Sequence, residues 1–193
     1  MSKTQSPIGI ASYPHLHKPD AKYGGFKVTL KVPSEDAQKF IGEIEAAQQA
    51  ELAKQKAINP KYKEKLADLP FSEDEEGNIE FKFKVAEEGK YGSRRPAFYD
   101  AKGMPSAPVA VGGGSKIRLG VSLYSWMTPT MGCGVSLQPI GVQVIDFTPA
   151  GSGGFQFDPA EGGFEAAEED QANNFAPVDE SPAPSTPSED EDF

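Results

Sequence analysis

The sequence predicts a mainly β domain, a small barrel of about five strands with one inserted helix, followed by an acidic tail. Three observations point to this. Several segments alternate apolar and polar residues, which is typical of half-buried strands. Glycine and proline together make up 37 of the 193 residues, which indicates that part of the chain does not pack. Basic and acidic residues are also divided unevenly between the front and the end of the chain.

The first strand is predicted over residues 22–32, where apolar residues alternate with polar ones. Lys27 and Lys31 fall on the polar face, which either is simply solvated or meets an anion. Residues 1–20 precede this strand. They are polar and contain three prolines, so we expect a loosely ordered arm.

One helix is predicted after the first strand. Ser34 is a suitable N-cap, and two acidic residues follow in the first turn, where the helix dipole favours them. An i, i+3, i+4, i+7 stripe of apolar residues starts at Ala37 and predicts one buried face. We expect the helix to end at about Ile58 with its far half exposed, and a second short helix over residues 61–69.

A second strand is predicted over residues 79–85, in which Lys82 and Lys84 form a basic outer face. Residues 91–99 then combine two arginines with aromatic rings. The fork of a guanidinium suits phosphate, and aromatic rings suit base stacking. A further short strand is expected at residues 107–111.

Two long strands joined by a turn are predicted over residues 116–147, and the rest of the chain is organised around them. In the first strand, alternate residues are apolar, and the other face has Lys116 and Arg118 at one end and Tyr124 and Trp126 at the other. Cations and aromatics on one face suit a polymer with phosphates and flat bases. A register shift of one residue would instead bury Trp126 as a core anchor, and this alternative stays open.

The return strand is interrupted by Pro139 and Gly141. Proline cannot donate a hydrogen bond to a central ladder, so a bulge or an edge is expected there. Such a kink would let one long strand bend around the corner of a small barrel. About five strands with one helix match the size of an OB-fold, a Greek-key barrel that binds oligonucleotides.

The net charge of −10 is distributed very unevenly. Residues 149–193 contain twelve acidic residues and no Lys or Arg, whereas the first 148 residues are slightly basic. The tail is also rich in Gly, Pro and Ser, so it cannot bury enough apolar surface to offset its ordering entropy. We therefore expect three parts: a flexible arm at 1–20, a binding domain at 21–148, and a disordered tail at 149–193.

The sequence gives no positive support for an enzyme, and no catalytic residue is assigned. It has no Walker, HExxH, zinc-ribbon or nucleophile-elbow motif. His15 and His17 lack further ligands, and Cys133 is the single cysteine, so we expect neither a metal nor a cofactor. A nuclease that holds metal through scattered carboxylates stays formally open. No apolar run is long enough for a membrane span, so no membrane contact is expected.

The chain resembles a known family at this point. The final residues Glu-Asp-Glu-Asp-Phe resemble the tails of phage and bacterial single-stranded-DNA-binding proteins. The stretches RRPAFYDAKG, GSKIRLGVSLYSW and GCGVSLQPIGVQVIDF resemble phage members of OB-fold type, except at Pro139, where a regular strand residue is expected. The resemblance covers roughly residues 80–147 and the last six. It implies an OB-fold, sequence-independent binding of single-stranded DNA in replication and recombination, and tail contacts with replication proteins such as polymerase, helicase or primase.

We therefore expect a binding protein of the infected bacterial host's cytoplasm, with a homodimer among the assemblies it allows. The residues expected to contact DNA are basic or aromatic: Lys27, Lys31, Lys82, Lys84, Arg94, Arg95, Tyr99, Lys116, Arg118, Tyr124 and Trp126. The residues expected to contact partners end the tail: Asp190, Glu191, Asp192 and Phe193. The acidic tail should compete with DNA for the basic groove, unless it only solubilises the protein. The alternative function is a protein-interaction module whose tail mimics DNA.

Overall fold

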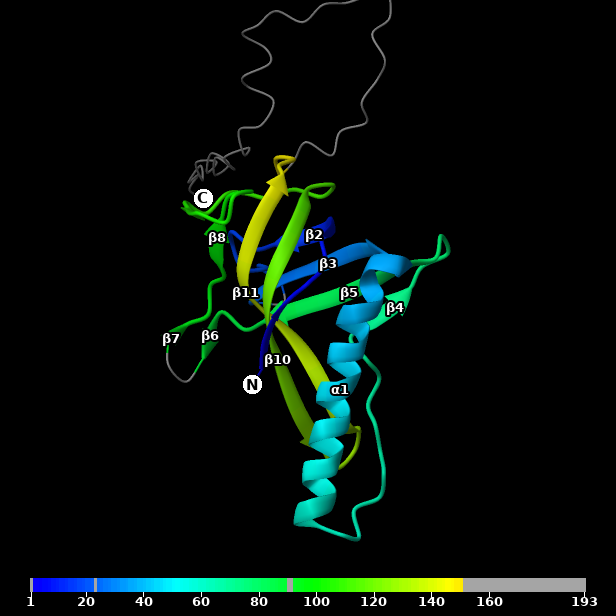
Figure 1. The fold of residues 1–193 in the computed structure, drawn as a ribbon. Coiled ribbons are helices and arrows are strands. Elements are labelled where there is room, and N and C mark those ends of the chain that lie inside the picture. Colours follow the sequence, from blue (N-terminus) through cyan, green and yellow to red (C-terminus); the bar gives the residue numbers. More distant parts are fainter. Residues whose placement is uncertain (1, 23, 90–91, 151–193) are drawn as a thin grey trace, which may run out of the picture. The chain divides into compact units, whose positions relative to one another are not determined.

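The computed structural model describes residues 2–22, 24–89 and 92–150, which form strands around one helix (Figure 1). The helix is α1 (Ser34–Ile58). The longer strands are β2 (Gly9–His15), β3 (Phe26–Pro33), β5 (Asn78–Val85), β10 (Lys116–Thr128) and β11 (Gly132–Asp146). The shorter strands are β1 (Ser2–Gln5), β4 (Phe71–Glu73), β6 (Glu88–Gly89), β7 (Gly92–Ser93), β8 (Ala97–Tyr99) and β9 (Pro105–Ser106).

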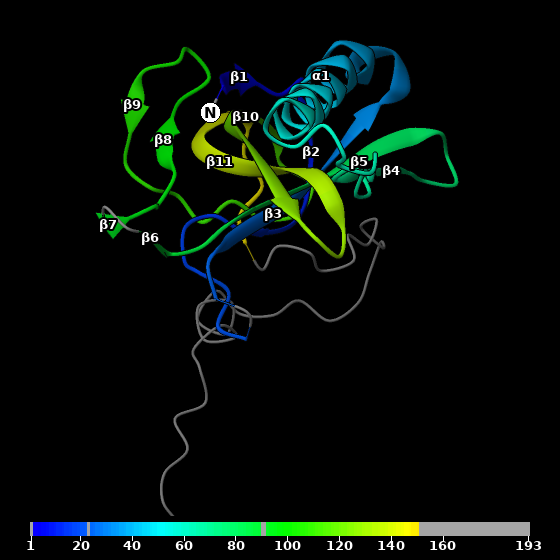
Figure 2. The same ribbon diagram turned by 90° about the horizontal axis from the view of Figure 1, so that it is seen from below.

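Five strands close into a ring in the order β10-β2-β3-β5-β11, and β11 pairs back with β10. All neighbours in the ring are antiparallel except β5 and β11, which are parallel and pair through Leu137 and Phe83. A five-stranded ring in this order is the OB-fold barrel that the sequence predicts. β1 extends the sheet beyond β10, and β8 and β9 extend it beyond β11 (Figure 2).

The core lies inside this ring because the apolar residues of each long strand recur at every second position. In β3 they are Phe26, Val28, Leu30 and Val32, and in β10 they are Ile117, Leu119, Val121 and Leu123, all buried. The first half of α1 packs against the barrel through Phe40, whose ring meets Phe81 edge-on with centroids 5.1 Å apart. The predicted strand faces are therefore confirmed over most of their length. Met127 continues the same alternation at the end of β10 and was expected on the apolar face, but it is exposed.

The predicted bulge in the return strand is confirmed. Gly120 pairs with Gly141 and the next residue, Val121, pairs with Pro139, so Ile140 is the extra residue on β11. Pro139 is buried, whereas Ile140 projects outward. The bulge allows β11 to bend, so one strand pairs with β5 along one half and with β8 along the other.

Residues 1–20 do not form the loosely ordered arm that we expected. They contain β1, which pairs with β10, and β2, which pairs with both β3 and β10. β2 is thus one of the five strands of the ring, and the barrel begins well before residue 21. The polar composition of this segment gave no sign of a strand, because β2 is held by pairing with β10, which lies about a hundred residues further along the chain.

Three smaller expectations were also wrong. Ser34 is the first residue of α1 rather than its cap, since Pro33 occupies the N-cap position without a side-chain hydrogen bond. Residues 61–69 form an extended connection instead of a helix, with Leu66 bridging to Cys133. Residues 107–111 form no strand, although Val111 makes a single bridge to Pro149.

The second half of α1 supports the β10–β11 hairpin, which reaches past the barrel (Figure 1). We expected this half of the helix to be exposed, but Gln48 and Leu52 are buried. The Gln48 Nε2 group donates to the backbone carbonyls of Ala67 and Cys133, at 2.7 and 3.0 Å. One buried amide therefore joins the helix, the 61–69 connection and the hairpin.

Candidate nucleic-acid interface

The outer face of β3 and β5 forms a basic groove. Antiparallel pairing sets Lys27 opposite Lys84 and Thr29 opposite Lys82, and these side chains point away from the core because their neighbours point into it. Two shallow cavities, of about 340 and 320 Å³, lie on this face and share Lys82 and Lys84. Among the described residues, neither of these two lysines has an ion-pair partner. Their charges are therefore available to an anion.

The first cavity extends from the two lysines to Tyr13 at the end of β2. Tyr13 is 83% exposed and has a φ of 49°, a conformation that L residues rarely adopt. Lys27 also borders this cavity and forms an ion pair with the buried carboxylate of Asp20. This end of the groove thus combines an exposed aromatic ring with a cation held in place by an acid.

The second cavity connects the groove to the β10–β11 hairpin. It is bordered by Arg94 and by Ser136 and Gln138 of β11. The Ser136 hydroxyl accepts a hydrogen bond from the Trp126 indole N–H at 2.9 Å. Trp126 is half-buried and lies over Gly134, so close that a side chain on Gly134 would overlap its ring. Its indole is therefore on the outer face of the hairpin, in line with the groove, and it does not belong to the buried core.

Tyr124 lies on the same outer face as Trp126, because the two residues alternate with the inward Leu123 and pair with Ser136 and Gly134. Its side chain is 39% exposed. Six of the residues expected to contact DNA therefore lie together on this face: Lys27, Lys82, Lys84, Arg94, Tyr124 and Trp126.

Other predicted residues lie elsewhere. Lys31 is held by two carboxylates, Asp74 and Glu76, each 2.7 Å from its ammonium. These contacts raise the pKa of Lys31, and the Lys31 contact together with hydrogen bonds from Asn78 and Glu76 lowers the pKa of Asp74 to about 2. Lys116 is exposed near Lys31 in a separate hollow.

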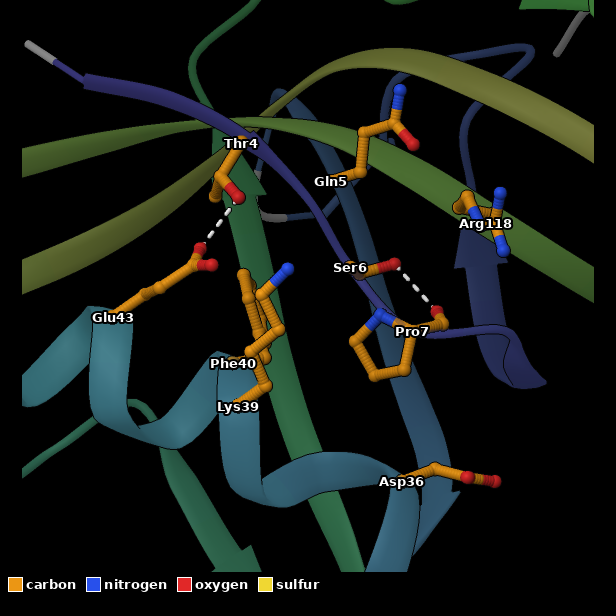
Figure 3. Close-up of a pocket in the computed structure, with 9 residues that line it drawn as sticks. All are labelled: Thr4, Gln5, Ser6, Pro7, Asp36, Lys39, Phe40, Glu43 and Arg118. Carbon is orange, nitrogen blue, oxygen red and sulfur yellow. Dashed lines mark hydrogen bonds between the residues drawn. The ribbon is translucent and has the colours of Figure 1, made fainter.

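Arg95 lies outside this cluster, because its guanidinium donates to the backbone carbonyl of His17 at 3.0 Å. Tyr99 and Arg118 share a third cavity of about 330 Å³ further along β11. Arg118 also borders another hollow of about 460 Å³ between β1 and α1, where Thr4 donates to Glu43 at 2.5 Å (Figure 3). The four predicted partner-binding residues, Asp190, Glu191, Asp192 and Phe193, lie outside the described residues.

Sequence reasoning missed Tyr13, Ser136 and Gln138. Tyr13 lay in a segment expected to be a loose arm, so no strand periodicity marked it. Ser136 and Gln138 do alternate with buried residues of β11, and extending the face argument from β10 to its return strand would have found them.

The family of the chain follows from a comparison with known protein families. A family model described as "Single-stranded DNA-binding protein, Bacteriophage T7" matches residues 8–147, which span the ring of five strands and all the groove residues named above. The chain belongs to this family. No curated protein matches the chain.

Solved structures agree in fold. The crystal structure of gp2.5, a single-stranded DNA-binding protein encoded by bacteriophage T7, superposes with a TM-score of 0.64 at 24% identity, covering 82% of this chain and 99% of that one. The single-stranded DNA-binding protein from bacteriophage Enc34 gives a TM-score of 0.54 at 17% identity, covering 80% and 87%. The same Enc34 protein in complex with single-stranded DNA gives 0.51 at 17%, covering 77% and 89%.

The described part of the chain contains no cluster of three or more His, Cys, Asp or Glu side chains placed to hold a metal ion. Within the same residues, α1 is not apolar enough over a sufficient length to cross a bilayer.

Proposed function

We propose that this protein binds single-stranded DNA without sequence preference and protects it during phage DNA replication and recombination. The observation that carries the proposal is the continuity of one outward face. Lys27, Lys82 and Lys84 on β3 and β5 lead through Ser136 to Trp126 on the hairpin. Cations bind phosphates whatever the base, and aromatic rings stack on any base.

This face suits single strands better than duplex. A duplex hides its base faces in the stack, whereas an unpaired strand can offer them to Tyr13, Tyr124 and Trp126. Each stacked base contributes roughly 1–3 kcal/mol. The proposed role is that of a binding protein that performs no chemistry and acts in the cytoplasm of the infected host.

The acidic tail is proposed to have two roles that are linked. Its charge would compete with DNA for the basic face, and its release on DNA binding would free the last four residues to recruit a polymerase, helicase or primase. The support for this is charge complementarity, since the tail has twelve acidic residues and no basic ones. Opposite charges on one chain attract most strongly at low salt.

The deciding experiment is fluorescence anisotropy with a labelled oligo-dT of about 30 nucleotides and the full-length protein. Unlabelled single-strand and duplex oligonucleotides serve as competitors. We expect single strands to compete far better than duplex, and the affinity to fall as salt rises. Absence of binding at low salt, both for the full chain and after removal of residues 170–193, would refute the proposal and favour a protein-interaction module.

The same assay tests the tail. Removing residues 170–193 should tighten binding, most clearly at low salt. Unchanged or weaker binding would refute the competition. Recruitment is tested separately by surface plasmon resonance against purified polymerase, helicase and primase. Phe193→Ala should weaken the contact while leaving DNA affinity unchanged; an equally strong contact would refute recruitment through the terminal residue.

A further inference from the structure

A separate cavity of about 330 Å³ lies beyond the β11 bulge and has the composition of a nucleotide pocket. Eight residues line it, and six of these carry the argument: Gln5, Tyr99, Arg118, Gly120, Gly141 and Gln143. They come from four adjacent strands, β1, β10, β11 and β8. Its volume is at the lower end of the range that small-ligand pockets occupy. One aromatic ring, one guanidinium and two amides in this space match a base, a phosphate and hydrogen-bonding base edges.

The floor of the cavity is bare backbone. Gly120 and Gly141 face each other across the β10–β11 pair, directly beside the bulge. A Cβ on Gly120 would meet only ordinary contacts, at 3.6 to 3.7 Å from Gly141 and Ile140. A Cβ on Gly141 would lie 3.3 Å from the Tyr99 ring. The Tyr99 ring therefore covers Gly141, and the open part of the floor is at Gly120, where no side chain fills the space beside the ring.

The polar groups of the cavity favour an anion. The Nε atom of Arg118 is buried, and among the described residues it has no hydrogen-bond partner. A buried donor without a partner is costly and calls for a ligand or water. None of the described residues that line this cavity is acidic, whereas the neighbouring hollow that also borders Arg118 contains Asp36 and Glu43. A phosphate would therefore bind Arg118 from the side of Tyr99.

The cavity continues the basic groove. Gln138 borders the groove and Ile140 borders this cavity, and the two residues are two positions apart on β11. At the rise of a β-strand they are separated by roughly 7 Å. A strand of DNA that crosses β5 and turns along β11 would therefore pass from one to the other without a gap.

We propose that this cavity takes one nucleotide of the bound single strand, with its base beside Tyr99 over Gly120 and its phosphate on Arg118. The proposal rests on the proposed function and adds to it a second, pocketed contact at the end of an open face. The bound strand would then make two kinds of contact along β11. Exposed rings hold stacked bases on the hairpin side, and an enclosed site holds one base beyond the bulge.

The test is to fill the pocket in the full-length protein with Gly120→Val. Valine suits a strand, and its Cβ has room, so the barrel should fold normally. Losing one stacked base should weaken binding of the 30-nucleotide oligo-dT by about fivefold or more. Gly113→Val is the matched control, because its Cβ would approach the Ala11 carbonyl no closer than 3.9 Å and it lies outside the cavity. It should bind as the wild type does.

A second readout identifies the occupant. An oligonucleotide with 5-iodouracil, irradiated on the protein and mapped by mass spectrometry, should cross-link to Tyr99 in the wild type. Gly120→Val should abolish this adduct and leave adducts at Tyr124 or Trp126. In a third variant, Arg118→Gln should lower the slope of log affinity against log salt by about 0.7, the share of one phosphate contact on a single strand.

The outcomes separate the two proposals. If the wild type binds no single strand, the proposed function fails as a whole. If it binds, but Gly120→Val keeps full affinity and its Tyr99 adduct, the pocket proposal alone is overturned. The same holds if Gly120→Val keeps full affinity for DNA but loses binding of a synthetic peptide of residues 186–193. The pocket would then take an acidic peptide instead of a nucleotide, and the proposed binding of DNA by the basic groove would stand.

Discussion

Two lysines of β5 provide the sharpest test of the proposed face. Replacing Lys82 and Lys84 with glutamine removes two charges that have no ion-pair partner among the described residues. Each phosphate contact on single-stranded DNA contributes about 0.7 to the slope of log affinity against log salt. The double variant should therefore lose about 1.4 from that slope. Between 50 and 200 mM salt, its affinity should fall about sevenfold less than that of the wild type.

Lys31 offers a matched control on the neighbouring strand. It belongs to the same alternating face, but its ammonium is held between Asp74 and Glu76. Lys31→Gln changes the net charge by the same amount as Lys82→Gln. The assay is anisotropy of labelled oligo-dT over a salt series, with thermal unfolding to check that each variant is folded. We expect Lys31→Gln to keep the wild-type slope. Equal losses for Lys31→Gln and Lys82→Gln would show that only overall charge matters, and would refute the assignment of specific contacts.

Three further predictions concern the frame around this face. The folded-state pKa of Asp74 is lowered to about 2, so its contribution to stability is complete above about pH 4 and is lost as the pH falls toward 2. Asp74→Asn should therefore be less stable than the wild type at pH 7. In urea titrations, the free energies of unfolding of the two proteins should converge near pH 2. A constant difference at all pH values would contradict this. Gly134→Ala should displace the Trp126 indole, because the added methyl group would overlap its ring. The fluorescence emission of this single tryptophan should shift to the red, and oligo-dT binding should weaken about fivefold. Unchanged emission would show that the ring does not lie on Gly134. Gln48→Met keeps the side-chain volume but removes the side-chain donor to the part-buried Ala67 carbonyl and one of the two donors to the Cys133 carbonyl, which keeps the Ala67 N–H. It should lower the free energy of unfolding in urea by about 1–3 kcal/mol, and a neutral result would mean that water replaces the amide.

The sequence predicted those parts of the fold that depend on local patterns. Alternation at every second residue gave the buried faces of β3, β5 and β10, because a strand with one buried face has no other period. Pro139 and Gly141 predicted the bulge for the same local reason, since proline removes a ladder hydrogen bond. These predictions needed no knowledge of which strand pairs with which.

The errors arose where a distant partner decides the structure. β2 has few apolar residues of its own, and it is a strand because β3 and β10 flank it. Pairing energy from neighbours overrides weak local propensity. The extended connection at residues 61–69 is another case, since Gln48 and the hairpin hold it by backbone contacts.

The candidate site shows the same division. Its residue types were predictable, because cations and aromatics on outward strand faces are visible in the alternation. The partners of the cations were not. Lys31 and the acidic loop at 73–76 are far apart in the sequence, and only the β3–β5 pairing places Asp74 beside Lys31. Likewise, only the bend of β11 separates Tyr99 and Arg118 from the residues of the groove.

The pairing of β2 with β10 has a consequence for how the chain folds. Ile10 meets Lys116, so the ring cannot close until a segment more than a hundred residues downstream is in place. Contacts of such long sequence separation slow folding, because the loop must close before the pairing gains any energy. During synthesis, the strands made first would keep unpaired edges until β10 is made, and these edges could pair with other chains. The late hairpin is therefore expected to act as the closing step of folding, and a chain halted before residue 146 should aggregate instead of forming a smaller barrel.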